Sequence, residues 1–276
     1  MKFKQPACVV TKMENVVRVA AVAMVLSLGL LVEPVAAACP VDSVQSGTVC
    51  MDTYEASVWL VAPAERTLIG KIQKGTATLA NLQSAGAVQL GLASGDLAAN
   101  GCPETGNGCL DVYAVSLPGV TPSVFITWFQ AAAAARNSGK RLPTNQEWQV
   151  AALGTPDPGA ADDGSTTCHT VYSIPITVPT GSRSGCRSDV GAFDMVGNIG
   201  EWVADWSDQA TGCTNFPASF GSDQSCVGGD GTYHLPGALF RGGYSSGGAN
   251  AGVFAVDAGV YPSFGGSPVL GFRCAR

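Results

Sequence analysis

The spacing of the cysteines constrains this fold more than any other feature of the sequence. Nine of the ten cysteines follow residue 38. Eight of these nine form neighbouring pairs, and each pair brackets a loop segment that has few apolar residues with which to build a core. In an oxidising compartment, such pairs are expected to form disulfides. We therefore predict four local disulfides: Cys39–Cys50, Cys102–Cys109, Cys168–Cys186 and Cys213–Cys226.

The N-terminus has the pattern of an export signal. Four basic residues precede or begin an apolar run of 14 residues (19–32), and three alanines follow at 36–38. This order is typical of a cleaved signal peptide, here 1–38. The run is short for a membrane span, and no later segment is apolar enough to cross a bilayer. We expect an exported chain, periplasmic, surface-located or secreted. A lipoprotein attached at Cys39 is disfavoured, because the residues before it lack the usual Leu and Cys39 has a disulfide partner.

The charge balance argues against a nucleic-acid partner. Removal of residues 1–38 takes away four of 15 positive and two of 21 negative charges, which leaves a net charge of −8. Proteins that bind nucleic acid rely on basic residues to contact phosphates. A zinc-type site is also disfavoured, because the chain has no Cys-x-x-Cys and only two histidines.

Two helices can be predicted from their capping residues. Residues 126–140 are rich in Ala, with a threonine at the second position to cap the start and Gly139 at the end. Residues 143–154 begin with Thr144 and Glu147 at capping-box spacing. A weaker apolar period predicts a helix within 76–90. The rest has short strands and many loops, which predicts a single α+β domain over 39–276.

Five motifs carry a family resemblance. In chain order they are CPVDSVQSGTVCMDTYEASVW, KRLPTNQEWQVAA, DVGAFDMVGNIGEWVADW, FRGGYSSGGANAGVF and LGFRCAR. Together they resemble the formylglycine-generating-enzyme/sulfatase-modifying domain, with family-specific insertions at about 65–112 and 207–236. The resemblance implies a C-type-lectin-like fold.

The chemistry of the enzymes in that family is not supported by the residues. The resemblance implies copper bound by a cysteine pair between the RGG and GFRC motifs, and two soft thiolates suit Cu(I). No cysteine lies between Gly243 and Gly271, and two histidines cannot supply the iron triad of other relatives. We expect a non-catalytic protein. The alternative is a degenerate enzyme of the same family with an unrecognised activity.

The C-terminal tail, about 241–276, resembles the variable region of proteins diversified by retroelements. Segments 241–243, 250–255 and 271–276 match the fixed pieces of those proteins. The residues between them are irregular, and all are reachable by changing the first two bases of an AAC codon. The resemblance implies that the irregular positions bind a protein or glycan on another cell, phage or host surface: Tyr244, Ser246, Gly247, Asp257, Gly259, Val260, Tyr261, Phe264, Gly266 and Pro268.

The alternative for the tail is a flexible glycine loop without a ligand. Exposed aromatic residues argue against it, since they are costly to leave uncovered and Tyr is a frequent binding anchor. We expect Tyr244, Asp257, Tyr261 and Phe264 to contribute most of the contact energy. Residues 250–255 are expected to be mostly buried, with Val253 or Phe254 as the anchor.

The resemblance also implies a calcium site and an unpaired cysteine. Asn198 and Glu201 in the GNIGEW motif offer hard oxygen ligands for calcium, although Asn198 could equally cap a turn. Asp162 and Asp163 precede Gly164, and we interpret them as turn residues. In the enzymes, the GFRC cysteine bridges to a helix position that is Ala135 here. We therefore expect Cys274 to be a buried free thiol, with its Cα atom about 5–7 Å from that of Ala135.

Overall fold

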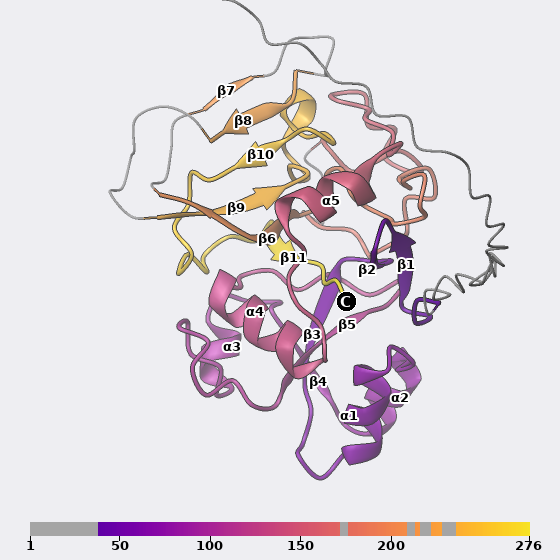
Figure 1. Cartoon of the computed structure of the whole chain (residues 1–276), viewed down its shortest axis with the longest axis vertical. Coiled ribbons are helices and arrows are strands. Elements are labelled where there is room, and N and C mark those ends of the chain that lie inside the picture. Colours follow the sequence, from indigo (N-terminus) through magenta and orange to yellow (C-terminus); the bar gives the residue numbers. More distant parts are fainter. Residues whose placement is uncertain (1–37, 172–175, 209–212, 216–221, 228–235) are drawn as a thin grey trace, which may run out of the picture. The chain divides into compact units, whose positions relative to one another are not determined.

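The computed structural model describes residues 38–171, 176–208, 213–215, 222–227 and 236–276, so the predicted signal peptide lies almost wholly outside the described residues. Residues 38–276 form one compact unit with two sheets and a separate hairpin (Figure 1). The N-terminal strands are β1 (Ser43–Ser46), β2 (Val49–Asp52), β3 (Ala56–Leu60), β4 (Val88–Leu90) and β5 (Val112–Ser116). The later strands are β6 (Gly200–Ser207), β7 (Thr214–Asn215), β8 (Gln224–Cys226), β9 (Gly237–Arg241), β10 (Val256–Asp257) and β11 (Leu270–Phe272).

The larger sheet contains every strand of the C-terminal half. Its order is β11-β6-β9-β10-β8-β7, whereas the smaller sheet has the order β4-β3-β5 and β1 pairs with β2 alone. Most pairings are antiparallel, as predicted, but β11–β6 and β10–β8 are parallel. The parallel pairing of β11 with β6 places the chain's last strand beside the GNIGEW motif, because Gly271 is in register with Glu201.

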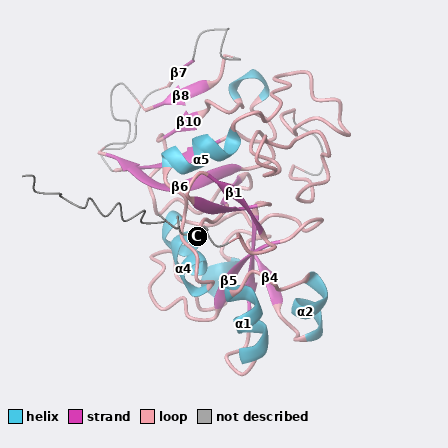
Figure 2. Ribbon diagram, turned by 45° about the vertical axis from the view of Figure 1, so that its right-hand side comes forward, coloured by secondary structure: helices cyan, strands magenta, loops and turns pink. Residues whose placement is uncertain are grey.

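The two capped helices are confirmed, each shorter than predicted. Helix α4 runs over Trp128–Asn137 and α5 over Asn145–Ala152, and Thr127 and Thr144 cap them with complete capping boxes. Gly139 and Gly154, beyond their ends, have φ of 66° and 76°. Positive φ ends a helix at little cost only in glycine. Figure 2 shows α5 against the six-stranded sheet and α4 near β5, in agreement with their contacts.

The helix predicted within 76–90 is wrong in extent. Helix α2 covers only Leu79–Ser84, and the chain then turns at Gly86, where φ is 67°, into strand β4. Two further helices, α1 (Arg66–Gln73) and α3 (Asp96–Ala99), were not predicted. Helix α1 follows Glu65 without a side-chain cap and buries only Leu68 and Ile72, so no capping signal marks its start in the sequence.

The main core lies where α4 meets the two sheets. Ala131, Ala134 and Ala135 are fully buried in one cluster with Trp202 and Phe272. Alanines let the helix backbone approach the sheet closely, so this face explains the Ala-rich sequence of α4. Within the described ranges, no helix is both long and apolar enough to cross a bilayer.

All four predicted disulfides are present in the structure. Their Cα–Cα distances are 5.4, 4.3, 4.6 and 4.0 Å in chain order. Cys274 is free and buried, as predicted. Its side chain and Ala135 are both 0% exposed and belong to the same core cluster. The distance between their Cα atoms stays a prediction.

Candidate ligand-binding site

The fixed arginine of the tail's RGG motif is a structural clamp. Arg241 is 4% exposed and donates to the backbone carbonyls of Val253 and Phe254 and to Gln149. Its guanidinium also lies 5.0 Å from the centroid of the Trp148 ring. Burial lowers the pKa of Arg241 to about 10, still well above neutral pH, so the clamp is charged. Arg241 therefore holds β9 against the 250–255 segment.

The two glycines of the same motif are required by conformation and by space. Gly242 and Gly243 have φ of 86° and 72°. A Cβ atom on Gly243 would lie 2.5 Å from the Cα of Ala251, and one on Gly242 would lie 2.9 Å from the carbonyl oxygen of Met195. A side chain at Gly243 would push two fixed pieces of the tail apart, and one at Gly242 would push the tail away from Met195 and Trp148.

Residues 250–255 are less buried than predicted, but Val253 packs against the core as predicted. Ala251, Gly252 and Ala255 are buried, whereas Val253 and Phe254 are only half-buried and Asn250 is exposed. The segment is held through its backbone and through small residues. The Phe254 N–H donates to buried Asp223 at 2.7 Å, and a Cβ on Gly252 would collide with the same carboxylate at 2.1 Å.

The last fixed piece is tied to the core by Arg273. This residue is 0% exposed and donates two hydrogen bonds of 2.6 Å to the carboxylate of Glu201. It also donates to the backbone carbonyls of Asp52 and Phe193. A Cβ on Gly271 would lie 2.3 Å from the carbonyl oxygen of Ser123. The fixed pieces of the tail are thus mostly buried and make specific contacts.

The irregular positions between those pieces are accessible to solvent. Ser246, Gly266 and Pro268 are exposed, and the other seven are partly exposed, so none of the ten is buried. Gly247 has the least room, because a Cβ there would lie 3.0 Å from the Cβ of Ala251.

Four of the irregular residues meet in one cavity, which we call the tail groove. Tyr244, Asp257, Val260 and Phe264 line it, and its volume is about 240 Å³. Framework residues complete it: Phe240, Ser267, Val269 and Leu270. Tyr244, Val260 and Phe264 also pack against the main core, so their inner faces are fixed while their outer faces remain accessible.

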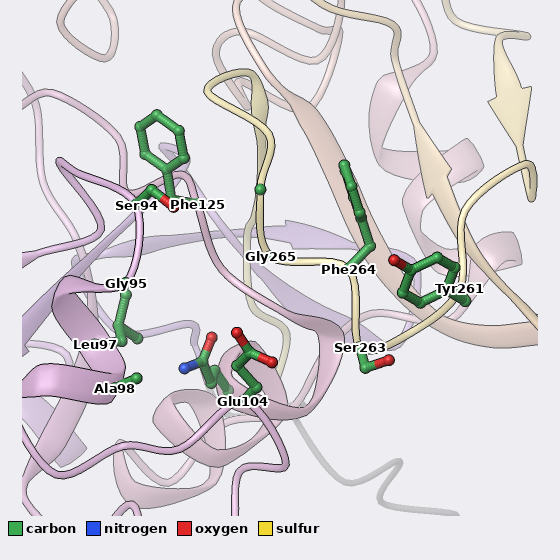
Figure 3. Close-up of a pocket in the computed structure, with 12 residues that line it drawn as sticks. Ser94, Gly95, Leu97, Ala98, Glu104, Phe125, Tyr261, Ser263, Phe264 and Gly265 are labelled. Carbon is green, nitrogen blue, oxygen red and sulfur yellow. The ribbon is translucent and has the colours of Figure 1, made fainter.

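Phe264 also lines a second cavity, which we call the loop pocket. Its volume is about 260 Å³, and Tyr261 and Gly266 line it as well. The opposite side comes from residues outside the tail, namely Ser94, Gly95, Leu97, Ala98, Glu104, Phe125 and Gln130. Figure 3 shows residues 94–98 along one side and Tyr261, Ser263 and Phe264 along the other, with Glu104 between them. The Tyr261 and Phe264 rings meet edge to face, with centroids 5.8 Å apart.

Four irregular residues line neither cavity: Ser246, Gly247, Gly259 and Pro268. Conversely, sequence reasoning missed Glu104 and residues 94–98, which lie in the insertion at 65–112. No motif marks them. Only the cysteine pair Cys102–Cys109 beside them indicated that this loop has a fixed shape.

The side chain of Asn198 does not fit the predicted calcium site. Its φ is 55°, so it occupies a turn. Its side-chain oxygen accepts from the N–H of Val178 at 2.9 Å, and its nitrogen donates to Glu55 at 2.6 Å. Both ends of the amide therefore have partners in the protein, as in the turn-capping alternative.

Glu201 does not fit the predicted site either. Both of its carboxylate oxygens accept from Arg273, and one also accepts from the indole N–H of Trp148 at 2.7 Å. A calcium ion would have to displace the guanidinium. Burial raises the pKa of the neighbouring Asp194 to about 7 and raises that of Glu55 well above its usual range. The positive charge of buried Arg273 thus lies near three buried acids, Glu201, Glu55 and Asp194.

Two other acidic groups are explained by local structure. The Asp163 carboxylate accepts from the backbone N–H groups of Ser165, Thr166 and Thr167, which confirms a turn. Asp257 lies close to the sulfur atoms of Cys213 and Cys226. Those sulfurs form a disulfide, so they provide no thiolate for a metal.

The α+β fold, with its buried frame and exposed tail positions, defines a C-type-lectin-like domain. The chain matches the family model described as "Sulfatase-modifying factor enzyme 1-like domain" over residues 44–276. The protein belongs to this family.

Curated relatives share only part of their length with this chain. The serine/threonine-protein kinase Pkn1 of Chlamydia trachomatis is 33% identical over 96 residues, which are 31% of this chain and 14% of the kinase. The formylglycine-generating enzyme of Thermomonospora curvata is 28% identical over 114 residues, 36% of this chain and 38% of the enzyme.

Solved structures with related folds include variants of the Major Tropism Determinant. The P3c variant has a TM-score of 0.41 and 19% identity, covering 82% of this chain and 51% of its own. Treponema denticola variable protein 1 has a TM-score of 0.33 and 20% identity, covering 57% and 71%. PvdO from Pseudomonas aeruginosa has a TM-score of 0.38 and 17% identity, covering 83% and 80%.

Proposed function

We propose that this chain is an exported, non-catalytic binding protein whose tail displays a diversified face for a protein or glycan ligand. One observation carries the proposal. Within 241–276, the irregular positions are all at least partly accessible, whereas most of the fixed residues, including Arg241, Gly252 and Arg273, are buried. A face that varies without disturbing the fold requires this separation of exposed and buried positions.

The proposed contact region is concave and aromatic. The tail groove and the loop pocket lie on either side of Phe264, with Tyr244 in one and Tyr261 in the other. Aromatic side chains provide large contact areas at a low cost in conformational entropy. Such residues are common hot spots of binding energy.

The missing cysteine pair also supports a binding role. No cysteine lies between Gly243 and Gly271, where the enzymes of the family hold copper. The described histidine, His169, is 1% exposed and lies beside Asp162 and Arg183, and it lines neither cavity.

The flanking DNA offers a test of diversification. We expect a nearby near-copy of the codons for residues 240–276 that differs only at adenines, together with a reverse transcriptase gene. A genomic neighbourhood with neither would contradict a retroelement origin of the tail.

Binding itself is tested by replacing Tyr244, Tyr261 and Phe264 together with Ala. The partner is first isolated by cross-linking the wild-type protein to intact cell or phage surfaces. Truncation of hot-spot aromatics commonly costs more than about 2 kcal/mol each, so the triple variant should lose detectable affinity for that partner.

The same variant requires a stability control. Because Tyr244 and Phe264 pack against the core, we expect the melting temperature of the triple variant to be lower by several degrees. The variant should still be folded at about 20 °C. Ser246→Ala, exposed and outside both cavities, should keep full affinity. Retained binding in the folded triple variant would contradict the proposal, and so would complete unfolding of that variant, because the three residues would then belong to the core.

A further inference from the structure

We propose that the two cavities beside Phe264 each receive a positively charged side chain of the partner. This inference rests on the proposed function and specifies the chemistry of the ligand. Each cavity combines aromatic rings with a single carboxylate, and neither lining contains a Lys, Arg or His.

In the tail groove, the carboxylate belongs to Asp257. Asp257 lines the groove together with Phe240, Tyr244 and Phe264, and its carboxylate accepts a hydrogen bond from the N–H of Gly259. Burial raises the pKa of Asp257. A partly buried carboxylate beside apolar rings is costly unless a donor or a cation pairs with it.

In the loop pocket, the carboxylate belongs to Glu104. The backbone at this residue is fixed, because its carbonyl oxygen accepts from the hydroxyl of Thr127 at 2.7 Å. The carboxylate lies opposite Tyr261 and Phe264, and Phe125 adds a third ring to the lining (Figure 3). Phe125 has φ of 53°, which is rare for an aromatic residue.

Among the residues that the structure describes, these two acids have no basic partner. Within the described ranges, no ion pair joins Asp257 or Glu104 to a basic side chain. The insertion at 207–236 contains no Lys or Arg, and its one histidine, His234, lies outside the described residues. A partner can therefore supply the cation for either site, and the net charge of −8 after residue 38 favours the approach of a basic partner.

The size of the cavities suits single side chains. With volumes of about 240 and 260 Å³, both are smaller than typical pockets for drug-sized ligands. A guanidinium or ammonium group is attracted to the faces of Tyr and Phe rings and pairs with a carboxylate. Lys or Arg side chains of a protein partner make both contacts, whereas a neutral glycan has no positive charge with which to make either.

The test uses two small probes and the protein from residue 39 onward. Nα-acetyl-L-arginine amide carries the cation, and Nα-acetyl-L-citrulline amide is its neutral isostere. NMR titration of the aromatic ring signals of Tyr261 and Phe264 measures binding of each probe. We expect the arginine probe to bind about tenfold more tightly than the citrulline probe.

Matched variants assign that preference to the two carboxylates. The double variant Glu104→Gln, Asp257→Asn keeps the shapes and hydrogen-bond acceptors, and should lose the preference for the cation. Glu65→Gln, at the start of α1 and outside both linings, should retain it. Equal binding of the two probes, no response to either, or an undiminished preference in the double variant would overturn the inference.

These outcomes are distinct from those that test the proposed function. A chain that binds its partner through Tyr244, Tyr261 and Phe264 but shows no preference for cations overturns only the charge inference. A chain that prefers the arginine probe but keeps full partner affinity after the triple alanine substitution overturns only the proposed binding face.

Discussion

At the scale of single residues, the tail contains two sets of positions: fixed residues that are mostly buried, and irregular residues that are at least partly exposed. Arg241 and Arg273 are buried, and each donates to several backbone carbonyls or carboxylates. Gly243 and Gly271 are positions where a Cβ would collide with backbone. The motif pattern predicted which residues are fixed. It did not predict that the fixed 250–255 segment is held by its backbone, because hydrogen bonds to a distant acid such as Asp223 leave no trace in the local sequence.

One residue-scale prediction concerns the free thiol. Ala135→Cys should form a disulfide with Cys274, because both positions are fully buried in one cluster. Closure of a loop this long would stabilise the protein by up to about 4 kcal/mol, less any strain from the added sulfur atoms. Thiol titration of the unfolded protein should find one free sulfhydryl in the wild type and none in the variant. Two free sulfhydryls in the variant would contradict the predicted proximity.

At the scale of helices and strands, the helices that could be predicted are those whose start is marked by a capping residue. Thr127 and Thr144 are local signals, and the structure uses both in capping boxes. The insertion at 65–112 has no such signal at α1, and the apolar period at 76–90 is divided between α2 and β4 by a turn at Gly86. The loop pocket was missed for the same reason, because it joins the insertion to the tail only in three dimensions.

Because Asp223 holds residues 250–255, the stability of the protein should depend on the protonation of this carboxyl group and therefore on pH. Burial and the nearby charge of Asp157 raise the pKa of Asp223 to about 7. The folded protein therefore holds a proton that the unfolded chain releases above its ordinary pKa of 3.8. Consequently, the free energy of unfolding should fall as pH rises from about 4 through about 7.

Calorimetry at about pH 5.5 and about pH 8 tests this dependence. Asp223→Asn keeps an acceptor for the Phe254 N–H and removes the repulsion from Asp157. It should raise the stability at the higher pH by on the order of 1 kcal/mol and flatten the pH dependence. Asp194, whose pKa is also raised to about 7, should leave part of the slope in the variant. An unchanged slope would contradict the assignment to Asp223, and exposed Asp208→Asn is the control.

At the scale of the whole molecule, the family fold is present and the family's catalytic cysteines are not. The protein from residue 39 onward should therefore fail to convert a peptidyl cysteine to formylglycine, with or without added copper. The formylglycine-generating enzyme of Thermomonospora curvata is the positive control. Mass spectrometry that detects an aldehyde product above the buffer background would contradict the non-catalytic assignment.

The fold class could be predicted because five motifs and four disulfides fix most of the chain. The partners of Asn198 and Glu201 could not be predicted from the motif: their side-chain oxygens accept from Val178 and Arg273. Whether a carboxylate binds a metal or a buried arginine depends on tertiary neighbours that a motif does not specify.

The central claim is that the buried frame folds the tail while the irregular positions determine what it binds. The most direct test is a display library randomised at the irregular positions other than Gly247, panned against an unrelated immobilised protein. A second library, randomised at 241–243, 251, 252, 255 and 271–273, is the matched control. We predict that the first library yields folded, protease-resistant clones that bind the new target specifically, and that the second yields almost no folded clones. If the first library yields no folded binders, or if the second folds equally well, the claim is contradicted.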